Sequence, residues 1–395
     1  MPNTTLDNRS NPASLSAWVS ALAGLAALAI AIGIGRFAFT PILPMMQEDS
    51  GLSVSEAGWL ASANYLGYLV GALSAIGMRV QSTIAIRVGL LVIGLSTLAM
   101  GLEYPFMSLV ALRAIAGIAS AWVLVFVSTW ALERLALLGR ANLSGIVYAG
   151  VGMGIVIAGG ACLLVMSRHA RSADAWFSLG AISIAVTAVI WPLVKASPSA
   201  NPVPPPAMAA SGIWGAEYWR LVLCYGAFGF GYIIPATFLP LMAKEIIPDP
   251  RLFGWAWPVF GAAAVISTVF AAQLKRFLSY RAIWIGGHLA MALGVVLPLI
   301  VAGLPGIMMS ALLVGGTFMV ITMAGMQDAR RIAGPHARAL MAAMTSAFAL
   351  GQLLGPVIVS LLVQSIGNFS PALVLAASML ALSAISLRQR EAKRE

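Results

Sequence analysis

Apolar runs of twenty or more residues recur along this 395-residue chain from one end to the other. The hydrocarbon core of a bilayer is about 30 Å thick, and a helix that crosses it needs about 20 mostly apolar residues. The composition agrees, because 60% of the residues are hydrophobic and only 9% are charged, a balance unlike that of water-soluble domains. We therefore expect an all-α integral membrane protein surrounded by the lipid bilayer.

Clusters of charged, Pro and Gly residues divide the chain into predicted membrane-spanning helices. There are twelve of them, at 16–46, 54–78, 82–102, 105–133, 140–166, 174–194, 216–244, 252–275, 281–302, 304–327, 336–366 and 369–388. Because this number is even, both termini are expected on the same side of the membrane.

Basic residues are distributed unevenly between the two sides that these spans define. Of the 23 Lys and Arg residues, two, Arg36 and Arg113, lie deep inside spans, and the loops and span ends of one side hold four, which are Arg168, Arg171, Lys244 and Arg251. The positive-inside rule assigns the other side, with the remaining seventeen, to the cytoplasm. Both termini are therefore predicted to be cytoplasmic, and the net charge of +10 needs no nucleic-acid partner to explain it.

A weak internal repeat relates the two halves of the chain. The pattern G-x-G-x8-P begins at Gly33 and recurs 196 residues later at Gly229, and a Gly-Trp pair at residue 58 recurs at the same offset at residue 254. Two copies in the same orientation predict parallel repeats around an axis along the membrane normal. A binding site is then expected near the midplane, between the copies.

The polar, Pro-rich stretch "SPSANPVPPPAMAASG" separates the sixth span from the seventh. Such a composition is typical of a semi-rigid connector. We therefore predict an N-terminal six-helix bundle over 1–195, a cytoplasmic linker over 196–214 and a C-terminal six-helix bundle over 215–395.

A single arginine, Arg36, interrupts the first span within "AIGIGRFAFTPILP". At about 1.5 Å per residue it lies roughly 6 Å beyond the midplane on the outer side. A central arginine costs about 2.5–3.5 kcal/mol on insertion scales, so it should face the bundle interior or a water-filled cavity. Pro41 and Pro44 are expected to free backbone carbonyls in the outer turn.

The partner of Arg36 decides its role. None of the thirteen acidic residues falls at its depth, so an anionic ligand held by charge-assisted hydrogen bonds is the favoured partner. The alternative is a structural role, with carbonyls or aromatic rings around the guanidinium.

Other polar residues fall at comparable depth in neighbouring spans. Arg113 lies in 105–133, and Asn64 and Tyr68 are one helical turn apart in 54–78. Tyr232 takes the place of Arg36 in the second copy. The predicted substrate-binding residues are Arg36, Arg113, Asn64, Tyr68, Tyr232 and Gln352.

Acidic and basic residues also occur together at the cytoplasmic ends of two spans that correspond in the repeat. Glu133 precedes Arg134 in one, and Asp328 is followed by Arg330 and Arg331 in the other. We predict a cytoplasmic gate or coupling site whose ion pairs form when the cavity faces outward. The alternative is a set of surface pairs worth about 0–1 kcal/mol each.

The twelve spans in two sets of six, together with "LVALRAIAGIASA" and "GVGMG", resemble the major facilitator superfamily. The stretches "GIGRFAFTPILPMMQ" and "GLSVSEAGWLASANYLGYLVGAL" are similar to its bacterial YbfB/YjiJ-type branch. The resemblance implies the major facilitator fold, a place in the inner membrane, and a central cavity where Arg36 and Arg113 could meet. Family members use the arginine at the position of Arg113 in coupling as well as in binding, so both roles stay open for it. Gly154 is followed by Ile155 where the superfamily's antiporter motif has proline, which argues against a drug/proton antiporter.

The resulting function is a secondary active transporter that moves a small organic anion across the cytoplasmic membrane by alternating access. The alternatives are a proton-coupled multidrug efflux pump and a non-transporting receptor or scaffold. Clustered catalytic residues and nucleotide or zinc motifs are absent, so we expect no enzyme activity, no cofactor and no metal. We expect a monomer. Because no acid lies mid-span, protons would travel on Glu133 or Asp328, on a weakly acidic substrate, or, as a less favoured alternative, on His288.

Overall fold

All regular elements of the protein are helices in the computed structural model, which describes residues 12–102, 105–195, 215–246, 250–366 and 370–388. The long helices are α1 (Pro12–Leu28), α2 (Phe39–Asp49), α3 (Val54–Gly77), α4 (Ser82–Ala99), α5 (Phe106–Leu137), α6 (Ser144–Ser167), α7 (Ser172–Ile190), α8 (Ala216–Ile246), α9 (Pro250–Leu274), α10 (Tyr280–Ile300), α11 (Leu304–Ala333), α12 (Ala337–Ile366) and α13 (Ser370–Arg388). Short elements are a π-helix (Ala29–Ile34) and two 3-10 turns (Ala141–Leu143 and Gly334–His336).

These helices supply the predicted membrane crossings. Within the described residues, eleven helical stretches are long and apolar enough to cross a membrane, and the longest, Pro305–Val359, has 55 residues. It includes both α11 and most of α12, and it is more than twice the length that one crossing needs. If this stretch is counted as two crossings, the total is the predicted twelve. The first crossing, Leu15–Asp49, combines α1, the π-helix and α2.

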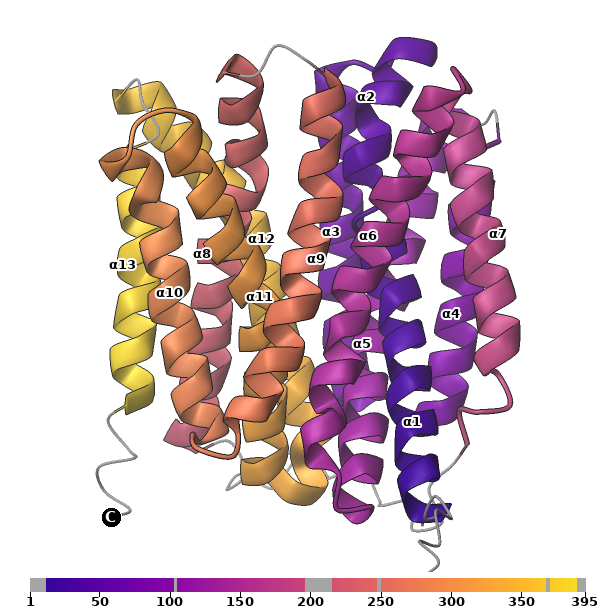
Figure 1. Ribbon diagram of the computed structural model, residues 1–395, viewed down its shortest axis with the longest axis vertical. Coiled ribbons are helices and arrows are strands. Elements are labelled where there is room, and N and C mark those ends of the chain that lie inside the picture. Colours follow the sequence, from indigo (N-terminus) through magenta and orange to yellow (C-terminus); the bar gives the residue numbers. More distant parts are fainter. Residues whose placement is uncertain (1–11, 103–104, 196–214, 247–249, 367–369, 389–395) are drawn as a thin grey trace, which may run out of the picture.

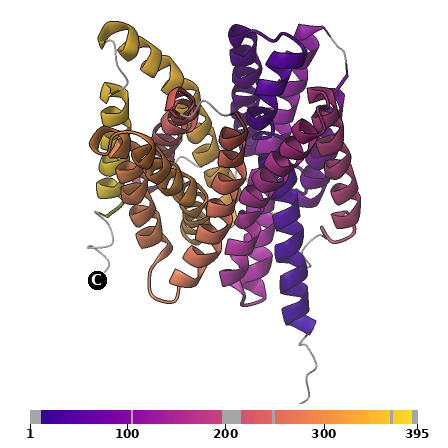
Figure 2. The same cartoon turned by 45° about the horizontal axis from the view of Figure 1, so that its top comes forward.

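Helix packing confirms the predicted pseudo-symmetry. In the first half α5 packs on α3 and α4, and α4 packs on α7; in the second half α11 packs on α9 and α10, and α10 packs on α13. The halves meet where α6 packs on α9 and where α3 packs on α12, which are again equivalent pairs. Figures 1 and 2 show α1–α7 and α8–α13 as two adjacent groups. The predicted linker lies outside the described residues.

The first and last helices reach the same end of the molecule. In Figure 1, α1 begins and α13 ends at the lower end of the bundle. This arrangement agrees with an even number of crossings, and we refer to this end as the predicted cytoplasmic end.

The repeated glycines mark close contacts between helices. A Cβ atom added at Gly33 would lie 2.5 Å from the Cα of Gly154 in α6, and one added at Gly229 would lie 2.2 Å from the carbonyl oxygen of Phe348 in α12. Small residues let helix backbones approach closely, which stabilises helix pairs in a membrane. The two glycines thus hold equivalent helix pairs together. The repeat's counterparts at 240 and 254–255 lie outside the residues whose side chains are described.

Candidate functional site

The first crossing is broken at the position of Arg36. The helix passes from α1 into the π-helix Ala29–Ile34 and resumes as α2 only at Phe39. In between, the amide of Gly35 donates to the carbonyl of Ile30 at 2.8 Å, and the amide of Phe37 donates to that of Ile32 at 3.1 Å. Such i to i−5 bonds widen the helix, and short π segments are frequent at functional sites.

A proline accounts for where this break lies. Pro41 has no amide hydrogen, and its ring collides with the carbonyl of the residue four positions earlier, Phe37. That carbonyl instead accepts from the amide of Thr40 at 3.3 Å. The break therefore lies one turn before Pro41, and not in the outer turn where we expected it. Pro44 lies inside the continuous helix α2.

Arg36 is almost fully buried, with 4% of its surface exposed. Its Nη2 donates to the side-chain oxygen of Gln352 on α12. The guanidinium carbon lies 4.1 Å from the ring centroid of Tyr68 and 5.1 Å from that of Tyr65, both on α3. Three predicted residues, Arg36, Tyr68 and Gln352, are thus brought together from both halves of the molecule. Among the described residues no carboxylate contacts this arginine.

Tyr65 was missed in the sequence, although a signal for it exists. It lies three residues before Tyr68 and so falls on the same face of α3. Its ring covers the Arg36 guanidinium next to that of Tyr68.

Arg113 is buried on α5, and its guanidinium binds backbone carbonyls. Nη1 donates to the carbonyl of Gly35 at 3.2 Å, and Nη2 donates to the carbonyl of Arg36 at 3.4 Å. The guanidinium carbon also lies 4.8 Å from the ring centroid of Phe39. Arg113 therefore satisfies carbonyls at the helix break, a need that follows from the low polarity of the bilayer interior.

Asn64 supports this arrangement from α3. Its Nδ2 donates to the carbonyl of Arg113 at 3.0 Å. A Cβ added at Gly117 would lie 2.2 Å from the carbonyl oxygen of Asn64, so α3 and α5 touch here. Asn64 thus binds the backbone of Arg113, whose side chain in turn binds the backbone at Arg36.

Tyr232 lies in α8 at the place equivalent to Arg36, and it is 1% exposed. Its ring stacks on Phe318 of α11 with the centroids 5.2 Å apart, and it lies 6.3 Å from the ring of Phe348. Its hydroxyl has no hydrogen-bond partner among the described residues.

Several buried polar atoms around Arg36 share this lack of a partner. Within the described part of the chain they include Nε of Arg36, Nε2 of Gln352, the Tyr232 hydroxyl and Nε1 of Trp257. An unpaired buried donor costs about 1–3 kcal/mol, and native proteins contain few of them. These four donors come from both halves of the molecule and are free to bind acceptor atoms.

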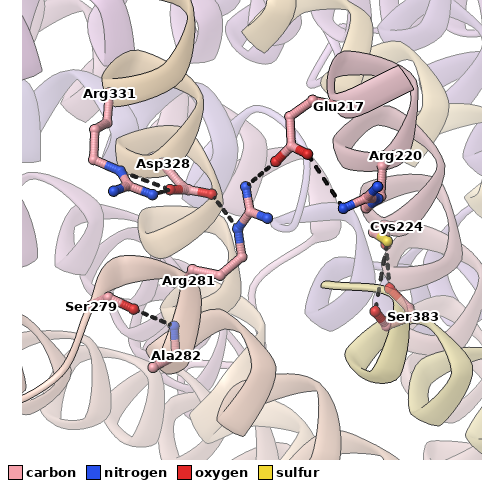
Figure 3. A network of polar contacts seen from close by, with 9 residues as sticks. All are labelled: Glu217, Arg220, Cys224, Ser279, Arg281, Ala282, Asp328, Arg331 and Ser383. Atoms are coloured by element: carbon pink, nitrogen blue, oxygen red, sulfur yellow. Dashed lines mark hydrogen bonds and ion pairs between the residues drawn. The ribbon is translucent and has the colours of Figure 1, made fainter. Parts of the chain in front are cut away.

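A second polar cluster lies at the predicted cytoplasmic end of the second half (Figure 3). Nε of Arg281 contacts Oδ2 of Asp328 at 2.7 Å, and Nη2 of Arg281 contacts Oε1 of Glu217 at 2.8 Å. Nη2 of Arg331 contacts Oδ1 of Asp328 at 2.9 Å, and Nη1 of Arg220 contacts Oε2 of Glu217 at 3.3 Å. The Asp328 side chain is 0% exposed and that of Arg281 is 4% exposed.

The predicted gate residues differ in their contacts. Asp328 pairs with Arg281 and Arg331, and no ion pair between Asp328 and Arg330 occurs among the described residues. Glu133 is exposed, and it forms no ion pair with any of the described residues. The neighbouring Arg134 donates from Nη1 to the carbonyl of Lys195 at 3.5 Å.

The fold and its polar centre between two six-helix halves define a membrane transporter of the major facilitator superfamily. A family model described as "Uncharacterised MFS-type transporter YbfB" matches residues 28–388, and the chain belongs to that family. Members of the superfamily are transporters, which confirms that the chain is not an enzyme.

No curated protein sequence matches this chain. The crystal structure of the human organic anion transporter MFSD10 (TETRAN) matches with a TM-score of 0.75, covering 96% of this chain and 100% of that one at 14% sequence identity. At this identity the similarity establishes the major facilitator fold alone.

Proposed function

We propose that the protein is a secondary active transporter that carries a small organic anion across the cytoplasmic membrane. The observation that supports this most is Arg36, a buried cation at a helix break with no acidic partner among the described residues. Charged side chains at this depth usually mark substrate or ion pathways. An anion would complete the arginine's hydrogen bonding through charge-assisted contacts.

The contacts of the six candidate residues suggest a division of their roles. Arg36, Gln352 and Tyr232 carry unpaired donors, the Tyr68 ring covers the Arg36 guanidinium, and these four residues would touch the anion. Arg113 and Asn64 would act through the backbone, because their side chains already bind carbonyls. MFSD10 is named an organic anion transporter, so the major facilitator fold is compatible with such a cargo.

Contacts between the halves favour alternating access. At the predicted cytoplasmic end, Nη1 of Arg338 donates to the carbonyl of Val80 at 3.4 Å, and Nε2 of Gln327 donates to the carbonyl of Ala141 at 3.5 Å. Both bonds join the segments 1–195 and 215–395, which we propose to move as two units. These bonds would close the cytoplasmic side and would break when the site opens inward.

Asp328 is the candidate for coupling at this gate. It follows Gln327 directly, and its ion pairs fix the end of α11 to α10. Protons would then travel on Asp328, on the exposed Glu133, or on a weakly acidic substrate. Movement by exchange or down the anion's own gradient needs none of these groups, so protons are one of three possible driving forces.

Ligand-induced stabilisation tests the anion proposal. We expect benzoate or succinate to raise the melting temperature of the purified monomer in detergent, because a ligand that binds only the folded state stabilises it. Tetraphenylphosphonium serves as the control. If this lipophilic cation alone stabilises the protein, multidrug efflux replaces the anion proposal.

We place the protein in the inner membrane with both termini in the cytoplasm, and this topology has its own test. A fluorescent reporter after Glu395 should fluoresce as a cytoplasmic protein does, while a tag inserted in the loop at 48–52 should be accessible from outside. The seventeen-to-four distribution of basic residues predicts both results. Labelling with the opposite sidedness would refute the assignment.

A further inference from the structure

We infer that the cargo is an aromatic monocarboxylate, that is, a planar ring bearing one carboxylate group. This inference rests on the proposed function and specifies it further. It follows from the aromatic rings that adjoin Arg36 and from the number of charges free to bind.

A row of four stacked rings extends through the second half beside Arg36. The ring of Tyr232 stacks on Phe318 at 5.2 Å between centroids, Phe318 stacks on Phe260 at 5.3 Å, and Phe260 stacks on Trp257 at 5.5 Å. Their interplanar angles are 19°, 25° and 6°. The two ends of the row, Tyr232 and Trp257, each bear a buried donor without a partner.

Phe37 connects this row to the arginine. It follows Arg36 in the chain, and its ring lies 6.2 Å from that of Trp257 and 6.3 Å from that of Phe318, edge to face. Phe37, Trp257 and Phe260 are only partly buried, so their surfaces are not fully used by protein contacts. Aromatic pairs prefer stacked or edge-to-face geometry at these separations. A planar ring of the cargo could pack against these side chains in either geometry.

The charges favour one carboxylate rather than two. The guanidinium of Arg113 is already bound to carbonyls, which leaves Arg36 as the cation for the cargo. A second carboxylate would lie among aromatic rings, and burying an unpaired charge is costly. The neutral donors of Tyr232 and Trp257 suit at most a hydroxyl or another uncharged acceptor.

A matched pair of probes tests the inference on the wild-type protein. Benzoate and cyclohexanecarboxylate have the same charge and a similar size, but only benzoate is planar and aromatic. From the concentration dependence of the melting temperature at neutral pH, we expect benzoate to bind about fivefold more tightly, an effect of the size of one aromatic pair. Hydrophobicity alone would favour the saturated ring.

A substitution in the row supplies the second measurement. Phe318→Leu should weaken benzoate binding about fivefold and leave cyclohexanecarboxylate binding nearly unchanged. Phe270→Leu is the matched control, because Phe270 lies on α9 with 65% of its surface exposed, and it should alter neither. If Phe318→Leu fails to fold, the comparison of benzoate with cyclohexanecarboxylate on the wild-type protein still tests the inference.

The possible outcomes separate this inference from the proposed function. Equal binding of the two probes, or tighter binding of the dicarboxylate adipate, overturns the aromatic inference and leaves the anion proposal in place. Stabilisation by tetraphenylphosphonium alone overturns both. Absence of any shift with benzoate also overturns the inference.

Discussion

Arg36→Ala is expected to lower the affinity for the cargo about a hundredfold, while the protein is still inserted and folded. Two charge-assisted hydrogen bonds contribute about 3 kcal/mol, which corresponds to that factor. Insertion should not suffer, because the substitution removes a charge from the membrane interior. The measurement is the melting-temperature shift with benzoate or succinate, and Arg276→Ala, at an exposed turn, is the control.

Arg36→Lys distinguishes the planar guanidinium from a simple positive charge. A lysine keeps the charge but cannot bind a carboxylate through two parallel bonds. It would also lose the geometry of the contact with the Tyr68 ring. We expect a loss of affinity nearly as large as for alanine. If either variant binds as the wild type does, Arg36 has a structural role.

Arg281→Ala is expected to have the largest effect on stability. It removes the partner between two acids and leaves the fully buried Asp328 with only Arg331, whose side chain is 53% exposed. Breaking a buried ion pair from one side costs about 3–5 kcal/mol. The melting temperature should therefore fall strongly, whereas Arg331→Ala, which removes the exposed partner of the same acid, should change it little.

A double substitution separates stability from coupling at this cluster. Replacing both charges, as Arg281→Met with Asp328→Leu, removes the desolvation penalty together with the attraction and is often neutral or stabilising. If the double variant is stable but does not transport, the cluster functions in coupling. If it is stable and transports normally, the cluster serves only to join α10 to α11. Equal destabilisation by Arg281→Ala and Arg331→Ala would contradict the assigned geometry.

Much of this architecture is predictable from the sequence, because the bilayer imposes strong constraints. Apolar length determines the twelve crossings, and the structure places their ends within several residues of the expected ones. Arg36 is recognisable for the same reason, since a lone charge in an apolar run must have a special environment. The contact of Gly33 with Gly154 also agrees with a small-residue interface.

The contacts of the site were less predictable. Gln352 is 316 positions from Arg36, and no local pattern reports a pairing over that distance. The bond from Arg113 to the carbonyl of Gly35 lies directly after a π-helix, which depth alone cannot reveal.

Spacing at the gate distinguishes the two arginines that follow Asp328. Arg331 is three residues after Asp328 and shares its helix face, whereas Arg330 is two residues after it and does not. The structure pairs Asp328 with Arg331 accordingly. Arg281 and Glu217 belong to other helices, and only the fold brings them to Asp328.

Transport by purified protein tests the central claim most directly. Proteoliposomes containing the wild type, Arg36→Ala or no protein would be given the radiolabelled carboxylate that most raises the melting temperature. We expect saturable uptake with the wild type, and uptake with Arg36→Ala equal to that of protein-free liposomes. Equal uptake by the two proteins, or binding without any uptake by the wild type, would contradict an anion transporter centred on Arg36.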